Sequence, residues 1–171
     1  MGLPISIKIG YKNFEKLLDG AKYIDHHFVK KPFRKNNPMI MGCIGIWYNN
    51  FFKCETEAVL PYSQFLSKLP NYLQQASMES NGKSIDRSGK RVNYETGSIL
   101  WGSTGTNAQH AFFQLMHQGT KIIPSDFIAF KKSLYDDSNQ LEILNSNFLA
   151  QTNALMMGKS TSGKDLSLIH I

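Results

Sequence analysis

The stretch Ile99-Leu100-Trp101-Gly102-Ser103-Thr104-Gly105-Thr106-Asn107-Ala108-Gln109-His110 decides the fold class, because it joins a short apolar strand to a glycine-rich turn and then to a helix. Helical periodicity continues over residues 107–117. Two further short apolar segments, residues 58–60 and 120–123, are predicted as strands on either side of this unit. Since strands and helices alternate along the chain, we predict an α/β fold.

Helical patterns occupy much of the rest of the chain. Apolar residues recur at helical spacing over residues 11–28, 65–73 and 141–157, and we expect Pro70 to kink or split the second of these helices. Residues 39–52 are apolar almost all round, which predicts a helix buried on most of its faces. The segment Asp86-Arg87-Ser88-Gly89-Lys90 is a hairpin signal between residues 83 and 94. Helices outnumber the short strands, so we predict a helix-rich fold with an incomplete sheet, whose remaining strands lie outside this chain.

Composition narrows the class of protein. The 171 residues are 42% hydrophobic and 19% charged, with a net charge of +6, which excludes wholesale disorder and coiled coil. The positive charge allows anionic partners, but no repeated basic and aromatic pattern favours nucleic acid. The longest apolar run, residues 39–48, is about half of the ~20 residues that span a bilayer. With Cys43 and Cys54 as the two cysteines, we expect a soluble cytoplasmic protein with no membrane partner.

The densest polar cluster lies over residues 74–83, where a helical segment ends at Asn81-Gly82. Gln75 and Glu79 are four residues apart, so both project from one face if the helix persists that far. A carboxylate at a helix end beside amide groups can act as a general base. A solvated helix terminus with a Ser/Asn turn fits the same pattern, and the residues alone leave both interpretations open.

The second cluster is the glycine-rich turn over residues 101–110. Its backbone N–H groups and the following helix offer a site for an anion, with His110 on the first turn of that helix. The turn lacks the lysine of a P-loop and the third glycine of a dinucleotide fingerprint, and an ordinary tight turn also fits it. His110, Gln114 and His117 are close together on a helix, but no cysteine or carboxylate at suitable spacing completes a metal site, so we predict no metal.

Together with their surroundings, these two clusters resemble the glucose-6-phosphate isomerase family. The resemblance covers essentially residues 2–160, and it depends on motifs that are weak alone and specific in combination. The motifs are Gly45-Ile46-Trp47-Tyr48-Asn49-Asn50-Phe51-Phe52, Leu60-Pro61-Tyr62, Gln74-Gln75, Met78-Glu79-Ser80-Asn81-Gly82-Lys83, Gly105-Thr106-Asn107, Gln109-His110-Ala111-Phe112 and His117-Gln118-Gly119-Thr120. The resemblance implies a sugar-isomerase (SIS)-type three-layer α/β/α sandwich. Residues 1–57 are then the end of a first domain with connecting helices, and residues 58–165 are the beginning of a second.

The resemblance also implies a chemistry. This family interconverts glucose 6-phosphate and fructose 6-phosphate without a cofactor, as homodimers whose sites lie at the subunit interface. By motif, Glu79 is then the catalytic acid/base that moves a proton between C2 and C1 through an enediol. His110 is then the second catalytic residue, which assists ring opening in the site of the neighbouring subunit, and Gln75 binds the sugar substrate. The positive net charge fits a phosphorylated substrate.

The turn before His110 departs from the family pattern. Ser103, Thr104 and Ala108 stand where the family usually has Glu, Pro and Gly, which leaves a non-catalytic sugar-phosphate-binding module on the same scaffold as the alternative. A Gly-Gly-Arg-Tyr-Ser signature is expected just upstream of residue 2, and the catalytic lysine of the family is expected downstream. We therefore expect an interior fragment that is inactive alone, with residues 166–171 as a non-native, adapter-derived tail.

Overall fold

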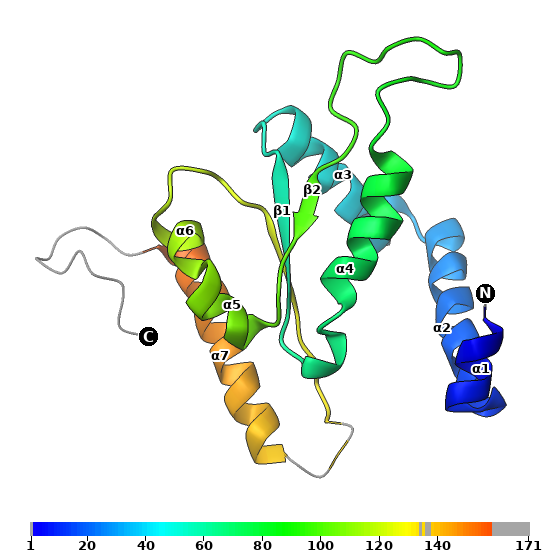
Figure 1. Cartoon of the computed structure of the whole chain (residues 1–171), viewed down its shortest axis with the longest axis vertical. Helices are drawn as coiled ribbons and strands as arrows, with labels where there is room; N and C mark the ends of the chain where they lie inside the picture. The colour runs from blue at the N-terminus through cyan, green and yellow to red at the C-terminus, as the bar shows by residue number, and fades with distance from the viewer. Residues whose placement is uncertain (1, 134, 136–137, 159–171) are drawn as a thin grey trace, which may run out of the picture. The chain divides into compact units, whose positions relative to one another are not determined.

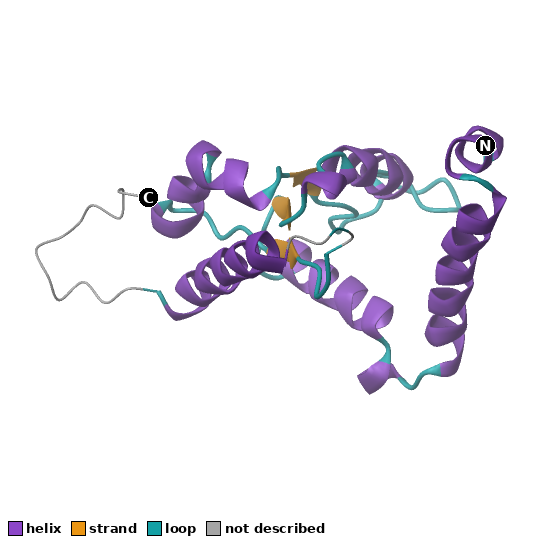
Figure 2. Ribbon diagram, turned by 90° about the horizontal axis from the view of Figure 1, so that it is seen from below, coloured by secondary structure: helices purple, strands orange, loops and turns teal. Residues whose placement is uncertain are grey.

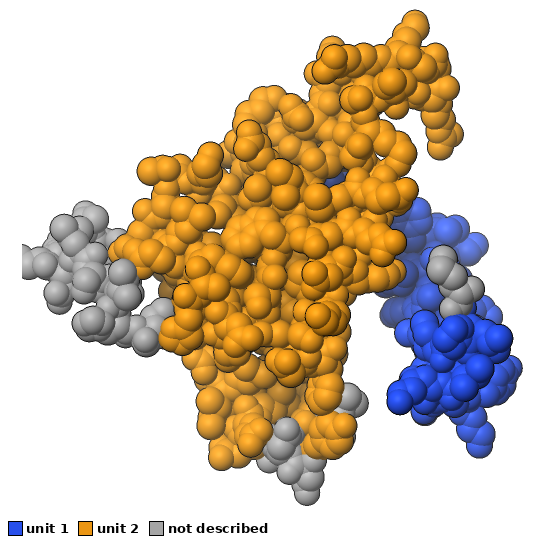
Figure 3. All heavy atoms as spheres, viewed as in Figure 1, with its two compact units in different colours: residues 1–45 blue, residues 46–171 orange. Residues whose placement is uncertain are grey.

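The computed structural model of this chain describes residues 2–133, 135 and 138–158. The predicted tail, residues 166–171, lies outside the described residues. The chain divides into two compact units, residues 1–45 and residues 46–171 (Figure 3). These units are not the two domains expected from the family resemblance, so the domain boundary predicted after residue 57 stays a prediction.

The first unit is helical. Helix α1 (Leu3–Ile9) and helix α2 (Tyr11–Lys30) meet at Gly10, whose φ of +80° lies in the left-handed region that favours glycine. A 3-10 helix, η1 (Phe33–Lys35), follows α2. Helix α2 confirms the helix predicted over residues 11–28.

Helix α3 (Asn37–Asn50) confirms the apolar helix predicted over residues 39–52. The prediction that most of its faces are buried is wrong, because Ile46 is 61% exposed and Trp47 is 56% exposed. An apolar composition makes burial favourable, but burial also requires a partner element, and the described residues leave these side chains open. Neither α3 nor any other helix in the described part is long and apolar enough to cross a membrane.

The second unit contains a parallel sheet with the strand order β2-β1-β3. Strand β1 (Thr56–Pro61) lies in the middle, with β2 (Ile99–Trp101) and β3 (Ser125–Ile128) on its two sides. The strands predicted over residues 58–60 and 99–101 are confirmed by β1 and β2.

The strand predicted over residues 120–123 is misplaced, because β3 begins at Ser125. The register with β1 decides its position, since Ala58 pairs with Ser125. The Ala58 amide also donates to the Pro124 carbonyl oxygen at 2.9 Å, so the ladder starts directly after a residue that has no N–H to donate. This register depends on a strand far away in the sequence, and the local apolar pattern therefore could not locate β3.

Helices cover both faces of the sheet (Figures 1 and 2). Helix α4 (Leu69–Leu73) contacts β1 and β2, and the π-helix η3 (Gln74–Glu79) continues it along β2 on the same face. Helices α5 (Gly105–Ala111), α6 (Phe113–Gln118) and α7 (Ser138–Met157) lie on the opposite face. The predicted three-layer α/β/α arrangement is thus confirmed, as is the helix predicted over residues 141–157.

Two of the predicted helices are interrupted. The helix predicted over residues 65–73 is split into a 3-10 turn, η2 (Gln64–Leu66), and α4. Pro70 lies in the first turn of α4, where its missing N–H leaves no intrahelical hydrogen bond unmade. The helix predicted over residues 107–117 divides into α5 and α6 at Phe112, whose φ of −149° and ψ of 1° are not helical.

A small core joins the sheet to α5 and α6. Ala58 and Leu60 are two residues apart in β1 and therefore point to the same face, where they contact Ala108 and Phe113. All four side chains are at most 1% exposed. Partly buried apolar side chains pack around them, namely Trp101, Phe112, Met116, Ile123 and Phe127. This core holds α5 against the sheet.

The connection from η3 to β2 contains the turn predicted as a hairpin over residues 83–94. It has a single antiparallel bridge, between Ile85 and Arg91. The Asp86 carboxylate closes the turn, accepting hydrogen bonds from the Ser88 amide at 2.8 Å, the Ser88 hydroxyl at 2.7 Å and the Lys90 amide at 2.9 Å. These hydrogen bonds, the Ser88 hydroxyl first, lower the pKa of Asp86.

Candidate active site

The helix that carries Gln75 and Glu79 is fixed to the sheet by the residue before Gln75. The Gln74 side-chain amide donates to the Leu100 carbonyl oxygen in β2 at 2.8 Å. The helix runs on from α4 through η3 without a break, and its π-type turns insert an extra residue into the helical repeat, as often happens at functional sites. This role of Gln74 cannot be predicted from the sequence, because any residue can supply the backbone carbonyl that accepts its hydrogen bond.

Gln75 and Glu79 lie one turn apart in η3, and both side chains are exposed. The Ser80 hydroxyl donates to Glu79 Oε2 at 3.4 Å. The Lys83 ammonium group donates to the Glu79 and Ser80 carbonyl oxygens at 2.6 and 2.9 Å, so a cation caps the carbonyl end of the helix. The capped helix end thus presents a carboxylate and an amide to solvent, where a polar ligand can reach both.

His110 owes its position to the glycine-rich turn after β2. Gly102 has a φ of +152°, and a Cβ there would lie 2.0 Å from the Val59 carbonyl oxygen, so no larger residue fits without a shift of the backbone. Helix α5 then starts with a hydrogen bond from the Ala108 amide to the Thr104 carbonyl oxygen, at 2.8 Å. Ala108 is fully buried in the core, whereas His110 is exposed.

The elements that carry Glu79 and His110 lie on opposite faces of the sheet (Figures 1 and 2). Within the described part of the chain, the structure brings Gln75 and Glu79 together but joins neither to His110. The Nε2 atom of His117, which the sequence grouped with His110, lies 3.2 Å from the Oε1 atom of Gln151 in α7. Among the described residues, no three His, Cys, Asp or Glu side chains are grouped so that they could hold a metal ion.

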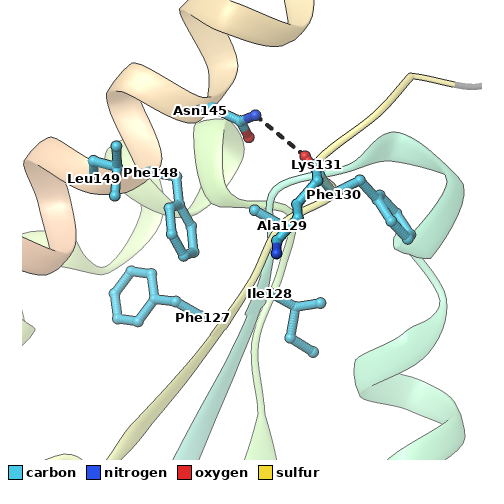
Figure 4. A pocket seen from close by; sticks show the side chains of 8 residues that line it. All are labelled: Phe127, Ile128, Ala129, Phe130, Lys131, Asn145, Phe148 and Leu149. Atoms are coloured by element: carbon cyan, nitrogen blue, oxygen red, sulfur yellow. Dashed lines mark hydrogen bonds between the residues drawn. The ribbon is translucent and has the colours of Figure 1, made fainter.

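An apolar groove of about 530 Å³ lies elsewhere, between the end of β3 and α7 (Figure 4). It is lined by Phe127, Ile128, Ala129, Phe130, Lys131, Asn145, Phe148 and Leu149. The Asn145 amide donates to the Phe130 carbonyl oxygen at 3.2 Å across its rim. The groove contains none of the predicted site residues, so the candidate site is the exposed end of η3 and not the groove.

Comparison with known proteins places this fold in a family. Residues 1–167 match the family described as phosphoglucose isomerase. A glucose-6-phosphate isomerase of Christiangramia forsetii is 61% identical over 160 residues, which are 94% of this chain and 30% of the relative. A glucose-6-phosphate isomerase of Wigglesworthia glossinidia brevipalpis is 57% identical over 168 residues, which are 98% of this chain and 31% of the relative.

A solved structure extends the likeness to three dimensions. The crystal structure of a glucose-6-phosphate isomerase from Chlamydia trachomatis matches with a TM-score of 0.83 and 40% sequence identity, over 91% of this chain and 31% of that one. The chain therefore spans about 30% of the length of the curated relatives it matches. With the family match extending over nearly every residue, this chain belongs to the phosphoglucose isomerase family.

Proposed function

We propose that this chain supplies part of the active site of an enzyme that interconverts glucose 6-phosphate and fructose 6-phosphate. The observation that carries the proposal is the family match over residues 1–167, within which Gln75 and Glu79 are presented together at the exposed end of η3. The net charge of +6 is compatible with a phosphorylated sugar. We place the enzyme in the cytoplasm.

Glu79 is the proposed acid/base. Its carboxylate takes the proton from C2 of the open-chain aldose, and the electrons of the C–H bond form the C1–C2 double bond of an enediol while the aldehyde oxygen gains a proton. Return of a proton to C1, with loss of the proton of the C2 hydroxyl, gives the ketose. A single carboxylate within hydrogen-bond reach of both carbons is sufficient for this transfer.

Gln75 and His110 have the supporting roles. The Gln75 amide lies one turn before Glu79, and its proposed role is to hydrogen-bond a sugar hydroxyl. The proposed role of the His110 imidazole is to exchange a proton with the ring oxygen, which is the step that opens the sugar ring. Because α5 and η3 lie on opposite faces of the sheet, we propose that His110 serves the site of a second subunit in a homodimer.

The test is a chimera in which this chain replaces the segment that it matches in the Christiangramia forsetii relative. A coupled assay is expected to detect isomerisation of fructose 6-phosphate. Glu79→Gln removes the base but keeps the shape of the side chain, so kcat is expected to fall by a factor of about 10²–10⁴, the usual contribution of a general acid/base. The matched control is Glu142→Gln, an exposed glutamate in α7.

Each outcome separates the proposal from its alternative. A chimera that binds sugar phosphate without converting it supports the non-catalytic binding module. A chimera whose activity survives Glu79→Gln refutes the role of Glu79. His110→Ala, compared with the exposed control His26→Ala, tests ring opening, since its loss of activity should be smaller when the substrate is supplied as the open-chain form.

A further inference from the structure

Tyr62, the residue that follows β1, occupies the space between the sheet and the helix that carries His110. Its side chain is 1% exposed, and its ring lies against Phe127 of β3, with centroids 6.2 Å apart, and against Phe148 of α7, at 5.5 Å. Gly105, the first residue of α5, lies directly on this ring, because a Cβ at that position would be 2.2 Å from a ring carbon of Tyr62. The tyrosine ring therefore sets how closely α5 approaches the sheet.

The polar end of the same side chain meets α5 one turn further on. The Tyr62 hydroxyl oxygen and the Gln109 Nε2 atom are both fully buried, and neither has a hydrogen-bond partner among the described residues. The Gln109 side chain is near enough to lower the pKa of Tyr62 in part, against the larger effect of burial, which raises it. A buried phenol and a buried amide without other partners are stabilised by facing each other, since an isolated buried polar group is costly.

The geometry of a helix connects this pair to His110. Gly105, Ala108 and Gln109 are spaced by three and four residues, so they lie on one face of α5, the face turned toward the sheet. His110 is the next residue after Gln109 and lies about 100° further round the helix, where it is exposed. Helix α5 has seven residues, too few to be rigid by itself, so its rotation depends on what this buried face contacts.

We infer that Tyr62 is a positioning residue for His110: its ring fixes the distance of α5 from the sheet, and its hydroxyl fixes the rotation of α5 through Gln109. The inference rests on the proposed function, in which the His110 imidazole acts at the ring oxygen of the sugar. A rotation of α5 displaces that imidazole while leaving the substrate contacts of Gln75 and Glu79 on η3 unchanged. The effect of losing Tyr62 should therefore appear in the chemical step and not in binding.

The first test is kinetic and uses the chimera with the Christiangramia forsetii relative. Tyr62→Phe keeps the ring on Gly105 and removes only the hydroxyl. We expect it to lower kcat about tenfold. A displacement of 1 Å can cost a catalytic group ~10²-fold in rate, and the displacement expected here is smaller than 1 Å. KM is expected to stay within about a factor of two of the parent value. The control is Tyr94→Phe, a 59% exposed tyrosine, which should leave both constants unchanged.

The second test distinguishes the loss of the interaction between Tyr62 and Gln109 from a general loss of stability. Gln109→Leu should lower kcat like Tyr62→Phe, and the double variant should be no slower than the slower single variant, because both changes break one interaction. Losses that multiply in the double variant, or a rise in KM that accounts for the lower kcat/KM, would overturn the inference. Thermal unfolding of each variant shows whether the population of folded enzyme has changed.

The third test does not need activity. In the chimera labelled with ¹³C-histidine, the His110 ring signal is assigned by its loss in His110→Ala, and it is expected to shift in Tyr62→Phe and stay in place in Tyr94→Phe. A His110 signal that stays in place in Tyr62→Phe overturns the positioning role, whatever the activity. If the parent chimera does not isomerise sugar phosphate, the proposed function fails, while the His110 signal still decides whether Tyr62 positions the imidazole.

Discussion

At the scale of single residues, two glycines determine how the polypeptide passes from β2 into α5. Gly102 has the positive φ that the turn requires and lies against the Val59 backbone with no room for a Cβ, and Gly105 lets the helix backbone lie on the Tyr62 ring. Two of the three residues that depart from the family pattern, Ser103 and Thr104, fall between these glycines, where Ser103 is partly buried and Thr104 is buried. The third, Ala108, is fully buried in the core.

Replacing Gly105 with alanine tests this packing. The new methyl group would overlap the Tyr62 ring, so we expect Gly105→Ala to lower the free energy of unfolding by about 1–3 kcal/mol, the usual cost of overpacking a core. Gly20→Ala is the matched control, because Gly20 lies within α2 with open space around it, and there alanine should stabilise by about 0.5–1 kcal/mol. Urea unfolding followed by circular dichroism measures both, and equal effects of the same sign would contradict the packing described here.

The residues of the candidate site differ in how far the sequence could predict them. Gln75 and Glu79 were predictable as a pair, because their spacing puts them one turn apart, and a carboxylate suits proton transfer while an amide suits hydrogen bonding. Gln74 and Tyr62 were not, because the first bonds a backbone carbonyl and the second contacts a glycine and an amide across a fold that no local pattern encodes. Supporting residues of this kind become visible only when the fold is known.

At the scale of elements, a pair of acidic side chains links two strands of the sheet. Asp126 in β3 pairs with Val59 in β1, and Glu57, two residues before Val59, points to the same face. Glu57 is partly buried, and burial first and the Asp126 carboxyl second raise its pKa. The folded sheet therefore favours the protonated, uncharged form of Glu57.

This shift fixes the sign of a pH dependence. Because the pKa of Glu57 is higher in the folded than in the unfolded chain, the stability it contributes is present below the unfolded pKa and is lost as the pH rises through the folded pKa. Glu57→Gln should therefore raise the free energy of unfolding at neutral pH and have little effect in acid. Urea unfolding between about pH 4 and about pH 8 measures this, with the exposed Glu55→Gln as control. If the free energy of unfolding depends on pH in Glu57→Gln as it does in the parent protein, the raised pKa of Glu57 is contradicted.

The elements were predictable to the extent that their signals are local. Helix α2 and strand β2 follow from periodicity and from an apolar segment before a glycine turn. The π-turns of η3 were not predictable, because the apolar spacing before them does not specify an extra residue in the helical repeat. The position of β3 and the exposure of α3 depend on partners that are remote in sequence, so the local pattern gave the kind of element without its register or burial.

At the scale of the whole molecule, the relatives are about three times as long as this chain, which spans about 30% of their length. The proposed site uses Gln75 and Glu79 on one face of the sheet, while His110 lies on an element of the opposite face. In the proposed function, a complete site therefore needs contributions from beyond a single copy of these 171 residues.

We accordingly expect the 171-residue chain alone to show no isomerase activity above the background of a coupled assay. The reason is physical: catalysis by a positioned acid/base needs all the groups that hold the substrate in a reactive geometry. The chimera with the Christiangramia forsetii relative, assayed at the same concentration, is the positive control. Substantial conversion of fructose 6-phosphate by the purified chain would show that these residues suffice.

The most direct test of the account is the incorporation of solvent deuterium by the chimera. With fructose 6-phosphate in deuterium oxide, Glu79 takes a proton from C1, and in a fraction of turnovers this proton exchanges with solvent before a proton is returned to C2. Proton NMR should therefore show deuterium at C2 of the glucose 6-phosphate product. The Glu79→Gln variant should incorporate none above the uncatalysed level, and Glu142→Gln should match the parent. Isomerisation without any deuterium at C2, or undiminished incorporation by Glu79→Gln, would contradict proton transfer by Glu79.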